Sequence, residues 1–372
     1  MRRSLALAIL CGASCLCAAD RWELQFFHDA KDTTLAINDL KFSSPGRGVA
    51  VGILTTKKGK TKPAMLVTSD GGRTWTYTSF KEIGISLFFL NESVGWLVTP
   101  DGIWKTVEAG RSWTKLRKSP KDVYRVLFLD ERSGWAVGAD KGVWETKDGG
   151  QNWSRVAAAE EVKSTRDYTF FSSITFVNGS TGIITGASVP PRRRGSPFPD
   201  WMDPELAEIR REWPAMNILL ETRDGGKRWT SSTMSLFGRI TRVVLAPQGT
   251  GLGLIEFFHF FEWPSEVFRL DWHSGKSERV FREKNRAVTD IAITPDGEAY
   301  LAGFEPSGKL HHAPIPGKLK ILRSSDLNQW QDMDVDYRAV ASRAVLSALD
   351  ESHIWVATDT GMILRLTTGN AQ

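Results

Sequence analysis

An eight-residue phrase that recurs along the chain constrains the fold more than any other feature. Its four full copies span residues 68–75, 106–113, 146–153 and 222–229, and each begins with threonine and ends with tryptophan. The tryptophans of the first three copies are 38 and 40 residues apart. A period of this size is typical of repeat folds, in which each unit buries its apolar face against its neighbours.

Each copy of the phrase has the composition of a tight turn. Asp-Gly between apolar runs is a strong hairpin signal, because glycine adopts positive φ without steric cost. The aspartate can accept hydrogen bonds from nearby backbone N–H groups, and we expect the tryptophan to bury its ring between sheets. We therefore predict structural roles for the acidic and tryptophan positions of these turns and of a shortened fifth copy: Asp70, Trp75, Glu108, Trp113, Asp148, Trp153, Asp224, Trp229, Asp326 and Trp330.

A second phrase, often containing Gly-Trp, precedes the first and predicts two strands joined by a polar turn. Its copies lie at residues 40–52, 87–98, 127–138, 174–186, 243–255, 291–303 and 346–358. Seven such units predict an all-β fold, a single seven-bladed β-propeller of four-stranded antiparallel blades. The last unit has only three expected strands, so we expect residues 21–27 to complete it and close the ring. Six or eight blades remain open, because units five and seven lack a clear turn phrase.

The first 19 residues have the pattern of a secretory signal peptide. Arg2 and Arg3 precede an apolar stretch that ends at Cys17, and small residues offer a cleavage site after Ala19. All three cysteines lie here, and a lipoprotein anchor is the alternative. We expect residues 20–372 to form one propeller domain, located in the periplasm or outside the cell. Its formal net charge of about +3 gives no reason to expect a nucleic-acid partner, and no later segment resembles a transmembrane span.

Four expected insertions, at residues 55–63, 188–215, 258–265 and 304–317, fall between the second and third strands of a blade. In a propeller these connections open on one face, and the turn phrases open on the other. Loops held by a rigid scaffold carry function, so we expect the ligand on the face that bears the insertions. The insertion at about 188–215, in the fourth blade, is expected to contain a short helix at 205–212.

Basic and aromatic side chains gather in these insertions. Guanidinium groups match carboxylates and phosphates, and exposed aromatic rings mark partner surfaces. A solvated loop, or packing of the aromatic residues against the ring, is the alternative reading of each group. The candidate partner-binding residues are Lys57, Lys58, Arg192, Arg193, Arg194, Trp201, His259, Phe260 and Trp263. The histidines lack the spacing of metal ligands, so we expect no metal and no cofactor.

The turn phrase resembles the Asp-box, or BNR repeat, of sialidase-type propellers. The sialidase site itself is not matched, since the Arg-Ile-Pro phrase that opens those enzymes is absent before the first blade. The paired phrases in residues 95–113 and 134–153 resemble the single-propeller family of photosystem II assembly and stability factors. That resemblance covers most of the mature chain and implies an exported, non-catalytic platform that docks a protein, here an envelope or membrane protein. Units five to seven and the large insertion depart from the family's pattern.

Two functions therefore remain open. The first is a non-catalytic scaffold that docks a protein partner on the face opposite the turn phrases. The alternative is a secreted glycan-binding protein or a glycoside hydrolase of sialidase-like fold. Such a protein would need a central pocket with Trp201 or Trp263 and two carboxylates, drawn from Asp200, Asp203, Glu256 and Glu262.

Overall fold

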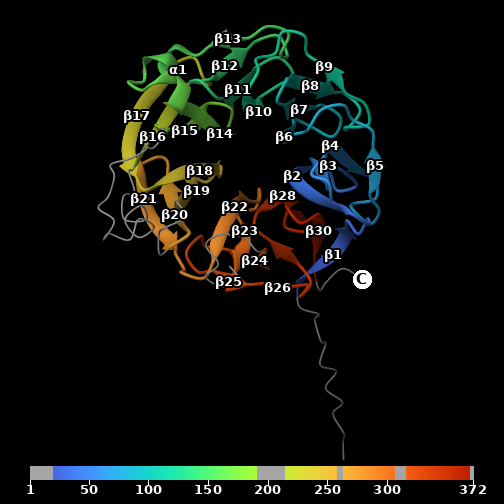
Figure 1. Cartoon of the computed structure of the whole chain (residues 1–372). Coiled ribbons are helices and arrows are strands. Elements are labelled where there is room, and N and C mark those ends of the chain that lie inside the picture. Colours follow the sequence, from blue (N-terminus) through green and yellow to red (C-terminus); the bar gives the residue numbers. More distant parts are fainter. Residues whose placement is uncertain (1–19, 191–213, 258–262, 306–315, 369–372) are drawn as a thin grey trace, which may run out of the picture.

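Seven β-sheets are arranged around one axis in the computed structural model, which describes residues 20–190, 214–257, 263–305 and 316–368 (Figure 1). In each of the first six sheets, four strands follow one another in chain order from the axis outward. The predicted seven-bladed, antiparallel propeller is therefore confirmed.

Blades 1 to 4 contain sixteen strands. Blade 1 comprises β2 (Thr33–Ser44), β3 (Arg47–Thr56), β4 (Thr61–Thr68) and β5 (Thr76–Thr78); blade 2 comprises β6 (Ser86–Phe89), β7 (Gly95–Thr99), β8 (Gly102–Thr106) and β9 (Thr114–Lys115). Blade 3 comprises β10 (Val123–Phe128), β11 (Gly134–Gly138), β12 (Val143–Thr146) and β13 (Ser154–Arg155); blade 4 comprises β14 (Thr169–Val177), β15 (Thr181–Ser188), β16 (Ala215–Thr222) and β17 (Thr230–Leu236). Helix α1 (Ala157–Glu161) and the 3-10 turn η1 (Arg166–Tyr168) connect blades 3 and 4.

Blades 5 to 7 complete the ring. Blade 5 comprises β18 (Gly238–Leu245), β19 (Thr250–Phe257), β20 (Ser265–Asp271) and β21 (Lys276–Phe281); blade 6 comprises β22 (Ala287–Ile293), β23 (Ala299–Glu305), β24 (Gly317–Ser324) and β25 (Gln331–Asp332). Blade 7 comprises β28 (Ala344–Asp350), β29 (His353–Thr358), β30 (Met362–Thr367) and β1 (Arg21–Phe27). Two short strands, β26 (Asp334–Val335) and β27 (Val340–Ala341), pair with β1 and β24.

The first strand of the described chain closes the ring, as predicted. β1 pairs antiparallel with β30, so that Arg21 lies opposite Thr367 and Phe27 opposite Met362. The ring of Trp22 is buried and meets Tyr300 of blade 6 edge-to-face, with centroids 6.4 Å apart. Closure therefore buries a large aromatic side chain and covers the outer edge of β30.

The repeated turns join the third and fourth strands of their blades and lie beside the turns between the first and second. In blade 1, Gly71 N donates to Gly46 O at 2.9 Å, and in blade 4, Gly225 N donates to Ser180 O at 2.8 Å. We call this side of the ring the turn face. The connections between blades and between second and third strands open on the opposite side, which we call the insertion face.

Hydrogen bonds inside the turn explain why its threonine and aspartate recur. Thr68 Oγ1 donates to Asp70 Oδ1 at 2.8 Å and accepts from Gly72 N at 3.0 Å, and Asp70 Oδ1 accepts from Thr74 N at 2.9 Å. The copies at 146–153 and 222–229 repeat this pattern. In the second copy, the longer Glu108 accepts from Ser112 Oγ at 2.6 Å.

The second glycine of the turn allows a close approach between blades. A Cβ atom at Gly226 would lie 2.3 Å from the Trp135 ring of the preceding blade. Trp135 stacks on Phe176 of blade 4 with centroids 4.7 Å apart, and the turn residue Trp229 meets both rings edge-to-face. Two other interfaces repeat this aromatic triad, in the sets Trp96, Phe128, Trp153 and Trp355, Phe42, Trp75.

Two expectations about local structure are wrong. The turn tryptophans are half-buried, whereas Trp96, Trp135 and Trp355 from the Gly-Trp phrase or its equivalent are at most 2% exposed. The tryptophan of the second strand thus lies in the interface between two blades, and the turn tryptophan covers the edge of this interface. The insertion expected at 55–63 is also wrong: β3 and β4 extend as a long hairpin and leave only residues 57–60 as the turn.

The aromatic triad predicts unequal costs for its two tryptophans. Trp135→Ala should reduce the free energy of unfolding by about 3–5 kcal/mol, since it leaves a cavity between two blades. Trp229→Ala removes the half-buried ring of the same triad and should cost about 1–3 kcal/mol. Urea unfolding of both variants, followed by intrinsic fluorescence, measures the difference. Equal losses would contradict the assigned order of burial.

The turn carboxylates predict a loss of stability in acid. Hydrogen bonds from the side chain and the backbone of Asn152 lower the pKa of Asp148 to about 2, and Arg228 does the same for Asp224. A depressed pKa in the folded state stabilises the fold above the ordinary pKa near 3.8, and the contribution is lost as pH falls towards 2. The melting temperature should therefore fall between pH 4 and pH 2.

Replacement of one turn carboxylate tests this assignment. Asp148→Asn should lower the melting temperature at pH 7 and flatten its fall below pH 4. Asp101→Asn makes the same change of charge at an exposed position outside the repeated turns and serves as the control. An acid profile of Asp148→Asn that matches that of the unaltered chain would refute the role given to this carboxylate.

Candidate functional site at the ring axis

The first strands of the seven blades, β2, β6, β10, β14, β18, β22 and β28, surround the axis (Figure 1). In five of these strands, a β-bulge shifts the pairing register immediately before one residue, and this residue is at the equivalent position in each repeat. The five residues are Asp39, Arg125, Ser173, Arg242 and Asp290. Such a bulge redirects the side chain that follows it. Charged residues from four blades are thereby placed at one level around the axis.

The two carboxylates at this level join neighbouring blades. Asp39 accepts hydrogen bonds from Leu40 N at 2.9 Å and from Leu87 N of blade 2 at 2.8 Å. Asp290 accepts in the same way from Leu346 N of blade 7 at 2.8 Å. Both carboxylates are buried, so each is held by its backbone partners rather than by solvent.

Two cations pair with these carboxylates. Lys41 Nζ lies 3.3 Å from Asp39 Oδ1 and 3.1 Å from Leu346 O, and Arg242 Nε lies 3.2 Å from Asp290 Oδ1. Burial alone would raise the pKa of Asp290. The positive charges of Arg242 and Lys41, together with the hydrogen bond from Leu346 N, hold that pKa below its ordinary value.

Arg125 differs from the other charged residues of this level. It is half-buried, and its guanidinium makes no hydrogen bond or ion pair within the described ranges of the chain. Burial, followed by the like charge of Arg242, lowers its pKa to about 10. We call Asp39, Lys41, Arg125, Arg242 and Asp290 the axial cluster.

Aromatic and basic side chains lie at the insertion-face ends of the inner strands of blades 3, 4, 5 and 7. Tyr124 of β10, 36% exposed, meets Phe170 of β14 edge-to-face with centroids 6.4 Å apart. The guanidinium carbon of Arg239 in β18 lies 5.8 Å from the centre of the Phe170 ring, and exposed Arg343 directly precedes β28. We call Tyr124, Phe170, Arg239 and Arg343 the axial mouth.

Most residues predicted from the insertions do not form this site. Arg192, Arg193, Arg194, Trp201, His259 and Phe260 lie outside the described residues, as does the helix expected at 205–212. Lys57 and Lys58 are exposed in the blade 1 hairpin turn, with Lys57 Nζ 3.7 Å from Asp32. Trp263 precedes β20 in blade 5, so the structure does not bring it together with these lysines.

Trp263 takes part in a second basic cluster of the insertion face. The guanidinium carbon of Arg282 and the Nζ atom of Lys284 each lie 5.1 Å from the centre of the Trp263 ring. Arg282 also forms an ion pair with buried Glu266. Glu256, a candidate carboxylate for hydrolysis, accepts a hydrogen bond from Thr241 Oγ1 at 2.8 Å.

Sequence reasoning missed the axial cluster because its members stand singly in strands from different repeats. A usable signal was nevertheless present. When the repeats are aligned on their second-strand Gly-Trp position, a polar residue recurs in six units, as Asp39, Ser86, Arg125, Ser173, Arg242 and Asp290. A polar residue in an apolar inner strand identifies a side chain that faces the axis.

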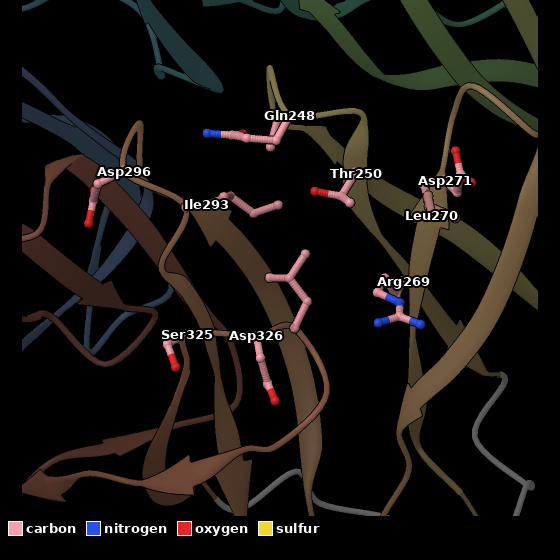
Figure 2. Close-up of a pocket in the computed structure, with 12 residues that line it drawn as sticks. Gln248, Thr250, Arg269, Leu270, Asp271, Ile293, Asp296, Ser325 and Asp326 are labelled. Carbon is pink, nitrogen blue, oxygen red and sulfur yellow. The ribbon is translucent and has the colours of Figure 1, made fainter.

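Two pockets open on the turn face, between neighbouring blades. One, of about 480 Å³, lies between blades 5 and 6, where Figure 2 shows Asp271 and Asp326 on opposite walls. The other, of about 770 Å³, lies between blades 3 and 4 and is lined by Glu131, Trp135 and Lys147. Hydrogen bonds from Ser274 lower the pKa of Asp271, and backbone N–H groups lower that of Asp326.

Every carboxyl group among the described residues whose pKa departs from its ordinary value is shifted downward. No group of three or more His, Cys, Asp or Glu side chains in these ranges could hold a metal ion. None of the helices in the same ranges is long and apolar enough to cross a membrane.

Comparison with solved structures identifies proteins of the same architecture. The structure described as YCF48 bound to D1 peptide superposes with a TM-score of 0.60 at 18% identity, over 93% of this chain and 97% of that chain. The chain shares its fold with YCF48. YCF48 from Cyanidioschyzon merolae gives a TM-score of 0.59 at 16% identity, over 94% and 99% of the two chains. At these identities the similarity establishes the fold and not the function.

A third similar structure has a different context. The extracellular domain of a putative one component system from B. thetaiotaomicron gives a TM-score of 0.54 at 11% identity, over 92% of this chain and 39% of that one. No protein-family profile matches the sequence, and no curated protein matches it. This chain thus covers almost the whole length of YCF48 but less than half of the third protein.

The buried pair of the axial cluster yields a stability prediction. Asp290→Ala leaves Arg242 without its carboxylate and Leu346 N without an acceptor, so unfolding should require about 3–5 kcal/mol less. Glu278→Ala breaks an exposed pair with Arg269 and should cost less than about 1 kcal/mol. Chemical denaturation of both variants provides the comparison. Similar small losses would mean that the axial pair is not structurally required.

Proposed function

We propose that this chain is an exported, non-catalytic propeller that binds an acidic segment of a protein partner at the axial mouth on the insertion face. The observation that carries the proposal is that Arg239 and Arg343 lie at the same insertion-face ends of the inner strands as the rings of Tyr124 and Phe170. Arginine and aromatic side chains are the residues that most often anchor protein interfaces.

Charge supports an acidic partner. The axial cluster and Arg343 contribute four cations against two carboxylates, and both carboxylates already have partners in the fold. Among these six residues, two positive charges are therefore in excess. An acidic segment would be attracted to these cations, and its association would weaken as salt increases.

Fold similarity supports a peptide as the occupant. One structure of the same fold is described as YCF48 bound to D1 peptide, so a single propeller of this size can bind a peptide. The signal-peptide pattern of residues 1–19 supports an envelope or membrane protein as the candidate partner. Glu256, one of the carboxylates named for the alternative of a glycoside hydrolase, accepts a hydrogen bond from Thr241 Oγ1 within its own blade.

Charge reversal at the mouth tests the proposal. A variant with Arg239→Glu and Arg343→Glu should lose a partner that the unaltered mature chain captures from the envelope fraction of its host. A matched control reverses two exposed arginines of the turn face, Arg73→Glu and Arg111→Glu. Affinity for the captured protein, measured with the purified pair, should fall at least about tenfold for the mouth variant and stay unchanged for the control.

Two further results would decide against this function. Equal affinity of the mouth variant and the control would remove the axial mouth as the binding surface. Saturable binding on a glycan array, or turnover of chromogenic glycosides, together with no captured protein, would favour the glycan alternative. A chain without residues 191–213 shows whether the fourth-blade insertion contributes to the same interface.

A further inference from the structure

We propose that Arg125 of the axial cluster, together with Arg343 of the axial mouth, binds one carboxylate or phosphate group and so forms an oxyanion-binding site. The inference rests on the proposed function for the route by which the anion arrives, since Arg343 belongs to the axial mouth. It goes further in naming the chemical group that is bound and the residue that binds it.

The carboxylates of the cluster are already committed to other groups. Asp39 Oδ1 accepts from Leu40 N and faces Lys41, and its Oδ2 accepts from Leu87 N. Asp290 Oδ1 faces Arg242, and its Oδ2 accepts from Leu346 N. Each carboxylate therefore uses both oxygens in hydrogen bonds and an ion pair with another cation. Both attract Arg125 electrostatically, but neither forms an ion pair or a hydrogen bond with it in the described ranges.

Arg125 consequently carries a half-buried charge without a partner in the described ranges. A guanidinium has five N–H donors, and leaving such a group partly desolvated and unpaired is costly. The like charge of Arg242 adds to this cost, and it outweighs the attraction of either Asp39 or Asp290. A bound anion would supply both the missing charge and the missing acceptors.

The geometry of guanidinium groups selects the class of anion. Their planar forks match the paired oxygens of a carboxylate or phosphate, whereas chloride offers a single acceptor. The two positive charges in excess at Arg125 and Arg343 match one phosphate dianion or the carboxylates of a dicarboxylate. The same chemistry is presented by a free anion and by an acidic side chain of a bound partner.

Calorimetric titration of the mature chain tests the site. Sodium phosphate, sodium succinate and a peptide of glutamates serve as probes at constant ionic strength, with sodium chloride and the matching glutamine peptide as controls. We expect one saturable site per chain for at least one oxyanion probe and none for the controls. Binding of phosphate or succinate identifies a free anion as the ligand, and binding of the glutamate peptide alone identifies a side chain. Binding of none of the three overturns the inference.

Two methionine variants show whether Arg125 is the binding residue. Arg125→Met keeps the length of the side chain without its charge and should weaken the binding at least about tenfold. Arg73→Met, at an exposed arginine of the turn face, should bind as the unaltered chain does. Equal affinities of the two variants would overturn the assignment of Arg125.

Thermal unfolding separates binding from a structural role. Without an oxyanion, Arg125→Met should melt at the same temperature as the unaltered chain or higher, because an unpaired charge has been removed. With the oxyanion, only the unaltered chain and Arg73→Met should gain thermal stability. A lower melting temperature of Arg125→Met, with an undiminished gain on anion addition, would make Arg125 structural and overturn the inference.

The outcomes of the two proposals are distinguishable. Loss of partner binding in the Arg239→Glu and Arg343→Glu variant, combined with the absence of any oxyanion site, would leave the proposed function standing and remove the axial site. Arg125-dependent oxyanion binding without any protein partner would leave the site and remove the docking function.

Discussion

Contact between neighbouring blades is the constraint on which the rest of this molecule depends. A four-stranded sheet has two faces, and neither can be buried within its own blade. The aromatic triads and the axial carboxylates both act across these boundaries, one near the turn face and the other at the axis. Stability and the candidate site therefore share one set of interfaces.

Because the axial carboxylates belong to the blade interfaces, the fold itself holds charged residues at the axis. Asp39 and Asp290 are fixed by backbone N–H groups of the adjacent blade, so their positions do not depend on a ligand. The cations beside them are consequently held in place before any partner arrives. A preorganised site of this kind spends less binding free energy on ordering side chains than a site built on loops.

The fold could be predicted from the sequence because its determinants are local and repeated. The turn phrase encodes hydrogen bonds between residues at most four positions apart, as in Thr68 with Asp70 and Asp70 with Thr74, and four full copies establish the period. The second glycine illustrates the limit of this reasoning. Its requirement at Gly226 comes from Trp135 of another blade, which no local pattern reveals.

The candidate site was less predictable for the same physical reason. Arg125, Arg242 and Asp290 come together only because the ring brings three inner strands to one axis, and each residue alone is an ordinary polar position in a strand. The insertions attracted the prediction because their composition is conspicuous. Lys57 and Lys58 show the weakness of that criterion, since they occupy the tip of an exposed hairpin.

The pairing of β1 with β30 has a consequence for how the molecule is made. The two strands come from opposite ends of the described chain, so blade 7 cannot be completed until nearly all of the polypeptide has been synthesised. Contacts between such distant segments form late and slowly in folding. Until β1 pairs with it, β30 has an unpaired strand edge. The ring is therefore complete only when β1 and β30, which lie more than 300 positions apart in the sequence, have paired.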